Sequence, residues 1–394
     1  MAAPKVLFYS PDSFGLGHFR RSLTIAEALA RNHPGIQMLC MTGSPRPDMF
    51  ELPDGFDTIK LPSITKNDNG EYESVAGHLD LSQVAHLRTS LVHAAIQEFS
   101  PDVFIVDHSP FGTLGELLPV LTAMRKKDRI LTIFGMRDIV DSPERLEREW
   151  TAQGVLEGLD SLFDHILVYA DPLVYDSRAE YGLERIAPGK SHLTGIVCRC
   201  PPCKGARGFR DGRPSTALVT TGGGKDGMHI IEAALAALPA DFHKIRVITG
   251  PLSKSSALAR IEKRVAADPR VSLLRESHQM CDELCDYDLV IGMVGYNTAY
   301  EVVRARKAYV AVPREGPRLE QRLRAERLSA LGLAVPVGSD PSGLEKRLRD
   351  ACKHARSPLE RLPRFDGADQ ASDLVVGWLG GRGVQPPRAA GKAS

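Results

Sequence analysis

Short apolar runs alternate with longer amphipathic segments along the first half of the chain. Residues 5–10 (KVLFYS) form a continuous apolar run that predicts a buried strand, and Leu23, Ala26 and Ala30 recur at helical spacing after it. Strands that alternate with helices predict a parallel sheet covered by helices. The same pattern predicts further strands at 36–42, 102–107, 129–134, 165–170 and 192–197, helices near 81–99, 114–125 and 143–159, and a polar loop over 45–72.

A second alternating series follows a stretch without apolar periodicity. Residues 198–214 (CRCPPCKGARGFRDGRP) hold three Cys, three Pro and three Gly, and predict a linker. We therefore expect two doubly wound α/β domains, 1–197 and 215–379, that face each other across a cleft. Residues 380–394 have almost no apolar content and predict a disordered tail. The second series predicts strands at 216–222, 244–250, 270–275, 287–292, 308–313 and 333–337, and helices at 228–238, 255–267, near 280, 298–304, 320–331 and 342–352.

Composition and charge exclude several classes of function. The 394 residues are 43% hydrophobic and 25% charged, as in a soluble globular enzyme. The 50 Lys and Arg balance 49 Asp and Glu, so the sequence predicts no nucleic-acid partner. No apolar run reaches the ~18 residues that a membrane-spanning helix needs, so any membrane contact would be peripheral. Seven cysteines and an N-terminus without a secretory leader predict reduced thiols in the cytoplasm, with the inner face of the membrane as a second location.

The loop after the first predicted strand carries a candidate catalytic histidine. Gly15 and Gly17 allow a tight turn at the carboxyl edge of the sheet, where open α/β folds bind ligands. His18 follows at the mouth of the helix, where the positive helix end favours a neutral imidazole that could take a proton from a hydroxyl. The alternative is that His18 only caps the helix or packs against the loop.

A glycine turn in the second half predicts a binding site for phosphate. Residues 220–227 (TTGGGKDG) satisfy the pattern G-x-G-x-x-G. The next predicted strand lacks the terminal acid of a dinucleotide site, and Val219 replaces the first glycine of a nucleotide triphosphatase loop. We expect the backbone N–H groups of Gly222, Gly223 and Gly224 to bind a diphosphate at a helix N-terminus, with a simple strand-to-helix turn as the alternative.

A further glycine turn follows the strand at 287–292. Gly295, Asn297 and Thr298 could donate hydrogen bonds to phosphate. Glu301 lies farther into the helix, where its two carboxylate oxygens could accept from both hydroxyls of a ribose.

Side chains elsewhere add candidate contacts to a substrate. Glu320 and Gln321, at the start of a later helix, could bind sugar hydroxyls. Asp107 and Arg137 follow strands and would lie at the cleft edge. The cysteines of the linker resemble part of a zinc knuckle, but no pair at zinc spacing follows nearby, so we predict no metal site.

These motifs together resemble those of GT-B glycosyltransferases. Residues 295–328 follow the order of a donor-binding signature: Gly, small polar residue, Glu, a strand that ends in Pro, and an acid-Gln pair. The family concerned includes the bacterial N-acetylglucosaminyltransferase that acts on the peptidoglycan lipid intermediate, and the loop from Gly15 to Arg21 resembles its glycine loop. The chain departs from the family at Met293, where a His is common, and at Glu320, where an Asp is common.

The resemblance implies a reaction and a set of roles. His18 would be the base for the acceptor, Glu301 would hold the ribose of the donor, and Glu320 with Gln321 would contact the donor sugar. The acceptor would be bound near Gly15, Gly17, Asp107 and Arg137. The donor would be a nucleoside diphosphate sugar, UDP-linked by resemblance, used without a metal or other cofactor. The acceptor could be a saccharide, a lipid-linked molecule or a small molecule.

Two other classes of function share this frame. One is a nucleotide-sugar epimerase or hydrolase, which differs in what attacks the anomeric carbon. The other is an accessory subunit that binds without catalysis, although the presence of both His18 and Glu301 argues against it.

Overall fold

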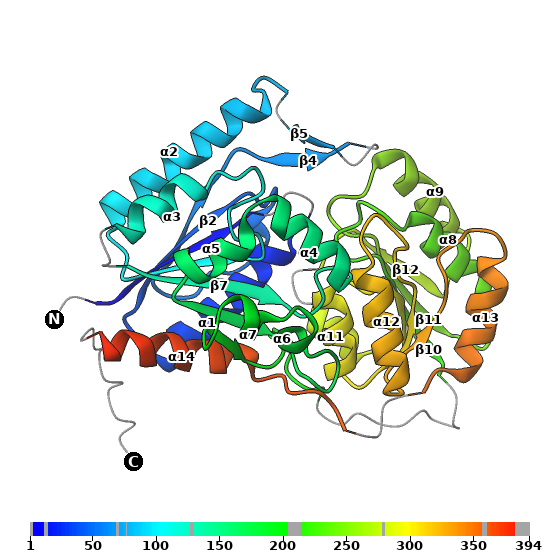
Figure 1. The fold of residues 1–394 in the computed structure, drawn as a ribbon. Helices are drawn as coiled ribbons and strands as arrows, with labels where there is room; N and C mark the ends of the chain where they lie inside the picture. Colours follow the sequence, from blue (N-terminus) through cyan, green and yellow to red (C-terminus); the bar gives the residue numbers. More distant parts are fainter. Residues whose placement is uncertain are drawn as a thin grey trace, which may run out of the picture. The chain divides into compact units, whose positions relative to one another are not determined.

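The computed structural model divides into two compact units, which are treated separately below (Figure 1). Unit 1 comprises Met1–Asp138, Pro143–Val197 and Arg364–Ser394, and unit 2 comprises Ile139–Ser142 and Cys198–Pro363. The residues that the structure describes are 3–11, 15–67, 71–75, 77–126, 130–203, 214–277, 280–356 and 361–382.

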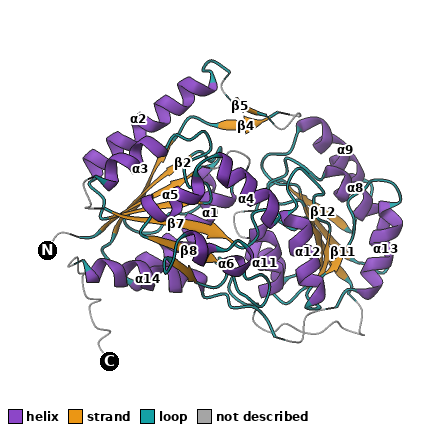
Figure 2. Ribbon diagram, in the orientation of Figure 1, coloured by secondary structure: helices purple, strands orange, loops and turns teal. Residues whose placement is uncertain are grey.

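Unit 1 is built on a parallel sheet with the strand order β3-β2-β1-β6-β7-β8-β9. Figure 2 shows helices around these strands. The strands are β1 (Lys5–Ser10), β2 (Gln37–Thr42), β3 (Phe56–Lys60), β6 (Val103–Asp107), β7 (Leu131–Arg137), β8 (His165–Tyr169) and β9 (Ser191–Leu193); β4 (Ile64–Lys66) and β5 (Tyr72–Ser74) form a separate antiparallel pair. The helices are α1 (Gly17–Asn32), η1 (Pro47–Met49), α2 (Leu81–Phe99), α3 (Leu118–Arg125), α4 (Pro143–Ala152), α5 (Val155–Leu162), α6 (Ser177–Glu180), α7 (Leu183–Ile186) and α14 (Gly367–Gly381).

Local sequence explains why these elements form. Every residue of β6 is buried, as expected for a central parallel strand covered on both faces. The helix α2 begins with a capping box, in which the Asp80 carboxylate accepts from the Gln83 backbone and the Gln83 side chain accepts from the Asp80 backbone. The single helix predicted over 143–159 is two helices, because the chain turns at Gly154, which has a left-handed φ of 66°.

Unit 2 repeats the parallel α/β plan with the strand order β12-β11-β10-β13-β14-β15. Its strands are β10 (Thr216–Thr220), β11 (Lys244–Ile248), β12 (Val271–Leu274), β13 (Leu289–Gly292), β14 (Ala308–Ala311) and β15 (Val335–Pro336). Its helices are α8 (Met228–Ala237), α9 (Ser255–Ala266), α10 (Met280–Cys285), α11 (Tyr296–Arg304), α12 (Glu320–Ala330) and α13 (Leu344–His354). Because β10 and β13 are parallel neighbours, the loops after them lie at the same edge of the sheet, at the point where the strand order reverses.

Three parts of the predicted organisation are wrong. The polar loop expected over 45–72 contains η1, β3 and β4, which were missed because the strands are short and β3 is largely uncovered on one side. The segment from Arg364 belongs to unit 1, although we assigned residues up to 379 to the second domain. Residues 380 and 381 are the end of α14, not the start of a disordered tail, and the rest of the predicted tail, from residue 383, lies outside the described residues.

The contacts of α14 explain its place in unit 1. Asp369 accepts hydrogen bonds from Arg31 and Asn32 at the end of α1, with N···O distances of 2.6 and 3.0 Å. Gly367 packs so closely that an added Cβ would lie 2.4 Å from the carbonyl oxygen of Gly195. Long-range packing of this kind is invisible in a local sequence pattern. Among the described residues, no helix combines the length and apolarity that crossing a bilayer requires.

Candidate active-site residues

His18 is anchored in unit 1 by a carboxylate from the neighbouring strand. It lies in the first turn of α1, and Asp107 is the last residue of β6, which pairs with β1. The Nδ1 atom of His18 lies 2.8 Å from Oδ2 of Asp107. Arg21, one turn along the same helix, donates to Oδ1 and Oδ2 of Asp107 over 2.9 and 2.5 Å. The structure therefore brings together two residues that the sequence analysis singled out and one, Arg21, that it did not assign a role.

The charge state of Asp107 fixes the tautomer of His18. Burial raises the pKa of Asp107, but the Arg21 guanidinium and the hydrogen bond to His18 outweigh it, so the net pKa is lower than usual. An ionised carboxylate only accepts hydrogen bonds, so its 2.8 Å contact with Nδ1 of His18 favours a hydrogen on Nδ1, whereas Nη2 of Arg21, 3.0 Å from the same Nδ1, can only donate and favours the other tautomer. We assign the hydrogen to Nδ1, because the contact with the charged carboxylate is the shorter of the two, and Nε2 is then the basic nitrogen. The same arrangement orients the imidazole in the Ser-His-Asp triad.

Asp107 is therefore not placed as we predicted. We expected its carboxylate to contact an acceptor, but it is buried and both oxygens are engaged by Arg21 and His18. The sequence could have suggested that His18 and Arg21 bind a common partner, because they are three residues apart and share one face of a helix.

Two aromatic side chains complete the surroundings of His18, and the sequence analysis assigned neither. The ring of His108 stacks on that of His18 with 4.7 Å between centroids. His108 has a φ of 66°, a left-handed conformation that is uncommon outside glycine and is found more often at functional sites. Behind the ion pair, the guanidinium of Arg21 lies 5.8 Å from the centroid of the Tyr169 ring.

The remaining candidates of unit 1 lie at the same edge of the sheet. Gly15 precedes α1, and a Cβ added there would meet nothing within 4 Å, so the space beside it is open. Gly17 is the first residue of α1. Arg137 is the last residue of β7, next to β6, and is partly exposed.

In unit 2 the predicted phosphate-binding turn contains one tightly packed glycine, Gly224. Gly222 and Gly224 have φ of 70° and 84°. A Cβ on Gly224 would lie 2.2 Å from the carbonyl oxygen of Thr249, so only glycine fits. The helix begins where we predicted, because its N-cap is Gly227 and α8 starts at Met228. Gly222, Gly223 and Gly224 thus form the loop before the helix, and their backbone groups are not its first turn.

The start of α11 lies beside this glycine turn. A Cβ added to Gly222 would lie 3.5 Å from Oγ1 of Thr298, so the turn after β10 lies next to the first turn of α11. Gly295 is the N-cap of α11, with open space within 4 Å of its Cβ position, and Asn297 and Thr298 occupy the first turn. The first N–H groups of a helix have no partner within it, so this turn can bind an anion.

Buried side chains hold the loop before α11 in place. The Tyr309 hydroxyl donates to the carbonyl oxygen of Met293 at 2.9 Å, and Nη1 of Arg324 donates to that of Val294 at 2.7 Å. Arg324 is 0% exposed, and its guanidinium carbon lies 5.8 and 6.0 Å from the ring centroids of Tyr296 and Tyr300. The sequence analysis did not identify Arg324, because a buried arginine cannot be told from a solvated one by spacing.

Glu320 and Gln321 begin α12 and are buried. The amide oxygen of Gln321 accepts from the backbone N–H groups of Val294 and Arg314 at 3.2 and 3.1 Å. Glu320 accepts from Nη2 of Arg314 at 3.3 Å. Gln321 thus links the loops after β13 and β14 through its amide oxygen, which has a structural role. Its contact with a sugar stays a prediction.

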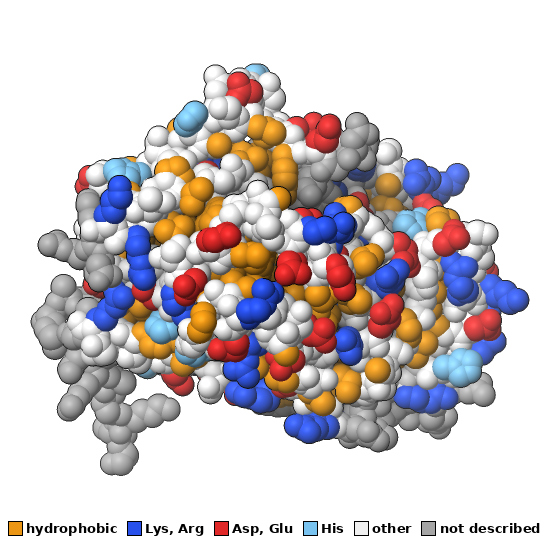
Figure 3. Space-filling view, viewed as in Figure 1, with side chains coloured by type: hydrophobic (Ala, Val, Ile, Leu, Met, Phe, Trp, Pro, Cys, Tyr) orange, Lys and Arg blue, Asp and Glu red, His pale blue; other side chains and the backbone are white. Residues whose placement is uncertain are grey.

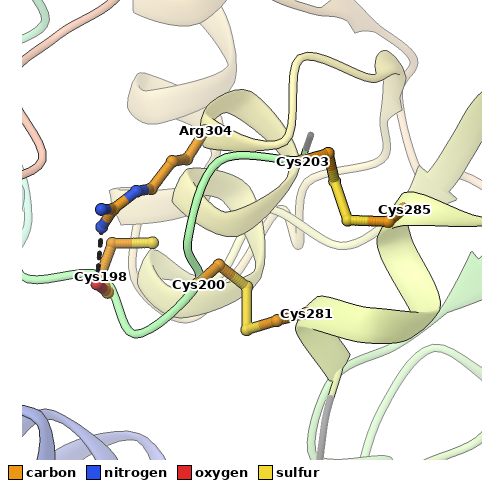
Figure 4. The surroundings of a disulfide bond; sticks show 6 residues. All are labelled: Cys198, Cys200, Cys203, Cys281, Cys285 and Arg304. Carbon is orange, nitrogen blue, oxygen red and sulfur yellow. Dashed lines mark hydrogen bonds between the residues drawn. A yellow bond between two sulfur atoms is a disulfide. The ribbon is translucent and has the colours of Figure 1, made fainter. Parts of the chain in front are cut away.

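Glu301, on α11, lies beside Cys200 and Cys281. It is 2% exposed, and one carboxylate oxygen lies within 4.8 Å of the sulfurs of Cys200 and Cys281. Arg304, one turn on, donates to the carbonyl oxygen of Cys198 over 2.9 Å (Figure 4). The segment 198–203 is therefore tied to α11, and the carboxylate is not on a solvated helix face.

Four of the seven cysteines form disulfides in the structure, contrary to our expectation of reduced thiols. Cys200 is bonded to Cys281 and Cys203 to Cys285. The prediction rested on the odd number of cysteines and on the N-terminus, and neither reveals that segments 81 and 82 residues apart meet in the fold.

The surface view agrees with the balanced charge of the sequence. On the face shown in Figure 3, basic and acidic side chains are interspersed rather than gathered by sign.

Comparison with known proteins identifies the fold. No family model and no curated protein matches the sequence. The structure is similar to that of CalG4, the calicheamicin glycosyltransferase, with 14% identity over 99% of this chain and 100% of that one and a TM-score of 0.56. Acinetobacter baumannii MurG gives 16% identity over 94% and 95% of the two chains, with a TM-score of 0.51. UDP-GlcNAc 2-epimerase from Methanocaldococcus jannaschii gives 10% identity over 94% and 98%, with a TM-score of 0.56.

These similarities extend over nearly the whole of each chain, and the sheets of both units have the parallel, doubly wound order that the sequence predicted. At such low identity the likeness concerns the fold alone. The chain has the GT-B fold, with two Rossmann-like α/β units, as the resemblance of its motifs implied.

Proposed function

We propose that the chain is a glycosyltransferase that moves a sugar from a nucleoside diphosphate donor to a hydroxyl of an acceptor. The observation that carries the proposal is the anchored His18. Its Nδ1 lies 2.8 Å from the carboxylate of Asp107, which would leave Nε2 to accept a substrate proton. The fold, shared with several glycosyltransferases, supports the same reaction class.

The proposed reaction is a direct displacement. Nε2 of His18 accepts the proton of the acceptor hydroxyl as the acceptor oxygen forms a bond to the anomeric carbon. The bond from that carbon to the diphosphate oxygen breaks, and its electron pair leaves with the diphosphate. Asp107 stabilises the imidazolium that forms and is a positioning residue, because it acts through His18.

Unit 2 would bind the donor. The N–H groups at the start of α11 and those of the turn at Gly222–Gly224 would stabilise the leaving diphosphate, a role that requires no metal in this proposal. Glu301 would accept hydrogen bonds from the ribose, and Glu320 and the amide nitrogen of Gln321 would contact the sugar. A UDP donor rests on the resemblance of residues 295–328 to the donor-binding signature.

A donor panel tests this function. The purified chain is incubated with UDP-, GDP- and dTDP-sugars, with and without candidate acceptors, and released nucleotide and new glycoside are measured by mass spectrometry. The matched thermal-shift assay uses UDP, GDP and dTDP at millimolar concentration, because a ligand that binds the folded state raises its melting temperature. The donor-site assignment is wrong if none of the three nucleotides moves the melting temperature.

Epimerisation is the second candidate, because the fold is equally similar to that of a nucleotide-sugar epimerase. The panel separates the two functions. A transferase releases nucleotide only when an acceptor is present, whereas an epimerase changes the sugar of the donor without one.

A further inference from the structure

Four cysteines from two distant segments meet in unit 2, and the proposed reaction uses none of them. Cys200 and Cys203 lie in the segment before β10, and Cys281 and Cys285 lie on α10 (Figure 4). Cys200 pairs with Cys281 and Cys203 with Cys285, with Cα–Cα distances of 5.0 and 5.5 Å. The two segments therefore run side by side with all four sulfur atoms between them.

The spacing within each segment is that of zinc ligands. Structural zinc sites take cysteines in pairs separated by two to four residues. Two residues separate Cys200 from Cys203, and three separate Cys281 from Cys285. The second pair is four positions apart on a helix, which puts both side chains on one face. The sequence analysis rejected zinc because no second pair at zinc spacing follows nearby in the sequence, and the fold removes that objection by bringing a distant pair to the same place.

We propose that, when these four cysteines are reduced, their thiolates bind one Zn²⁺ ion in a closed structural site. Reduction of each disulfide by a thiol or a phosphine gives two thiols, and zinc then displaces their protons without any change of oxidation state. At Zn–S distances of about 2.3 Å, the sulfurs of a tetrahedral site are about 3.8 Å apart. Within each disulfide the partners are already bonded across the two segments. Among the described residues, neither Cys203 nor Cys285 has its sulfur within 4.8 Å of both sulfurs of the Cys200–Cys281 pair, so the two reduced pairs must move toward each other to share one ion.

The chemistry of the ligands selects the ion. Thiolates are soft ligands that favour Zn²⁺ over Mg²⁺ or Ca²⁺, and four of them complete a tetrahedron with no position left for water. The site is therefore structural rather than catalytic. In a reducing compartment, such a cysteine pattern is more often a metal site than a pair of disulfides.

The carboxylate of Glu301 offers an alternative set of ligands for the metal ion. An oxygen of Glu301 lies within 4.8 Å of the sulfurs of Cys200 and Cys281, so these three groups could also hold an ion. We assign four sulfurs and no oxygen, because a Cys₄ set is complete without Glu301. The site would then fix the segment 198–203 beside the carboxylate that we propose for the donor ribose.

Metal content tests the proposal directly. The full untagged chain is produced with zinc in the medium, purified anaerobically with a phosphine reductant and without chelator, and analysed by elemental mass spectrometry. We expect about one zinc per chain, and seven reactive thiols after unfolding in the presence of a chelator. Replacement of zinc by Co²⁺ should give the intense absorption of a tetrahedral cobalt-thiolate centre.

Matched variants identify the ligands. Cys200→Ser, Cys203→Ser, Cys281→Ser and Cys285→Ser should each lower the zinc content at least tenfold at a fixed chelator concentration. Cys198→Ser, which changes a cysteine of the same segment, and Glu301→Gln should keep it. Loss of zinc in either control overturns the assignment of four sulfurs.

Two results overturn the site itself. One is a folded, reduced chain that holds no zinc after incubation with the ion. The other is a chain that shows only three thiols when it is purified under reductant, because the two disulfides then persist. If serine variants fail to fold, the cobalt spectrum of the unaltered chain still decides. None of these measurements uses a donor or turnover, so they are independent of the proposed glycosyl transfer.

Discussion

The candidate sites of the two units are made of different chemical groups, side chains in unit 1 and mainly backbone in unit 2. In unit 1, charged and aromatic side chains make the site: Asp107 engages Arg21 and His18, and His108 stacks on His18. In unit 2, backbone groups dominate, in a turn of left-handed glycines and in the first turn of α11. The difference matches the tasks that we propose, because proton transfer needs a titratable group whereas a diphosphate needs fixed donors.

The two designs should respond differently to mutation. A side-chain network loses its chemistry when one group is removed, while the fold survives. A site made of backbone is altered only through the conformation of the chain, so activity and stability should change together.

The largest expected effect is on turnover in unit 1. His18→Ala should lower kcat by roughly 10²–10⁴-fold, the usual contribution of general base catalysis, with little change in donor affinity. The measurement is kcat at saturating donor and acceptor, together with a melting curve. His93→Ala, which alters an exposed histidine on α2, is the control and should behave as the unaltered chain does. Near-normal turnover of His18→Ala would remove His18 from the mechanism.

Donor affinity should depend on Glu301 in unit 2. Glu301→Ala should weaken donor binding by about 1.5–3 kcal/mol, the range for a hydrogen bond to a charged group. Calorimetric titration with the nucleotide measures this change, and Glu326→Ala on the exposed face of α12 is the control. A folded Glu301→Ala variant with unchanged affinity would rule out the ribose contact.

A glycine substitution in unit 2 tests the coupling of binding and stability. Gly224→Ala should reduce stability by about 1–3 kcal/mol, because it adds a Cβ 2.2 Å from the Thr249 oxygen at a φ of 84°. Donor binding should weaken in the same variant. Gly223→Ala is the matched control, since its Cβ would meet only Leu252, at an ordinary distance of 3.9 Å. Equal losses in the two variants would show that backbone geometry is not the cause.

The smallest effect concerns a histidine of unit 1 outside the site. Burial, and to a smaller extent the neighbouring His192, lowers the pKa of His165 to about 4. The ring of His165 stacks on that of Trp378 in α14, with 3.7 Å between the ring centroids. Between pH 6.5 and 4 the unfolded chain binds a proton that the folded chain does not, so stability should fall as the pH falls through this window.

The expected loss at pH 5 relative to pH 7 is about 1 kcal/mol, less than the full linkage value because His165 is partly exposed to solvent. Melting temperatures of the unaltered chain and of His165→Asn at the two pH values measure it. The variant should lose less stability on acidification. Parallel pH profiles for the two proteins would contradict the assignment.

Much of the fold follows from local patterns. Continuous apolar runs such as those of β1 and β6 predict buried parallel strands because both faces of such strands are covered. The edge strand β3 lacks such a continuous apolar run, because half of it faces solvent, and it was therefore missed. The helix α14 belongs to unit 1 through contacts with α1, and no local pattern encodes them.

The sequence by itself determined the repeated α/β plan, the glycine turns after strands and the presence of a histidine at the start of α1, because these depend on local spacing and backbone freedom. Only the tertiary structure decided which groups meet. Asp107 reaches His18 because β6 lies next to β1 in the sheet, and Cys200 reaches Cys281 because the fold brings together segments 81 residues apart. Such contacts depend on strand order and packing, which act over distances that sequence spacing does not record.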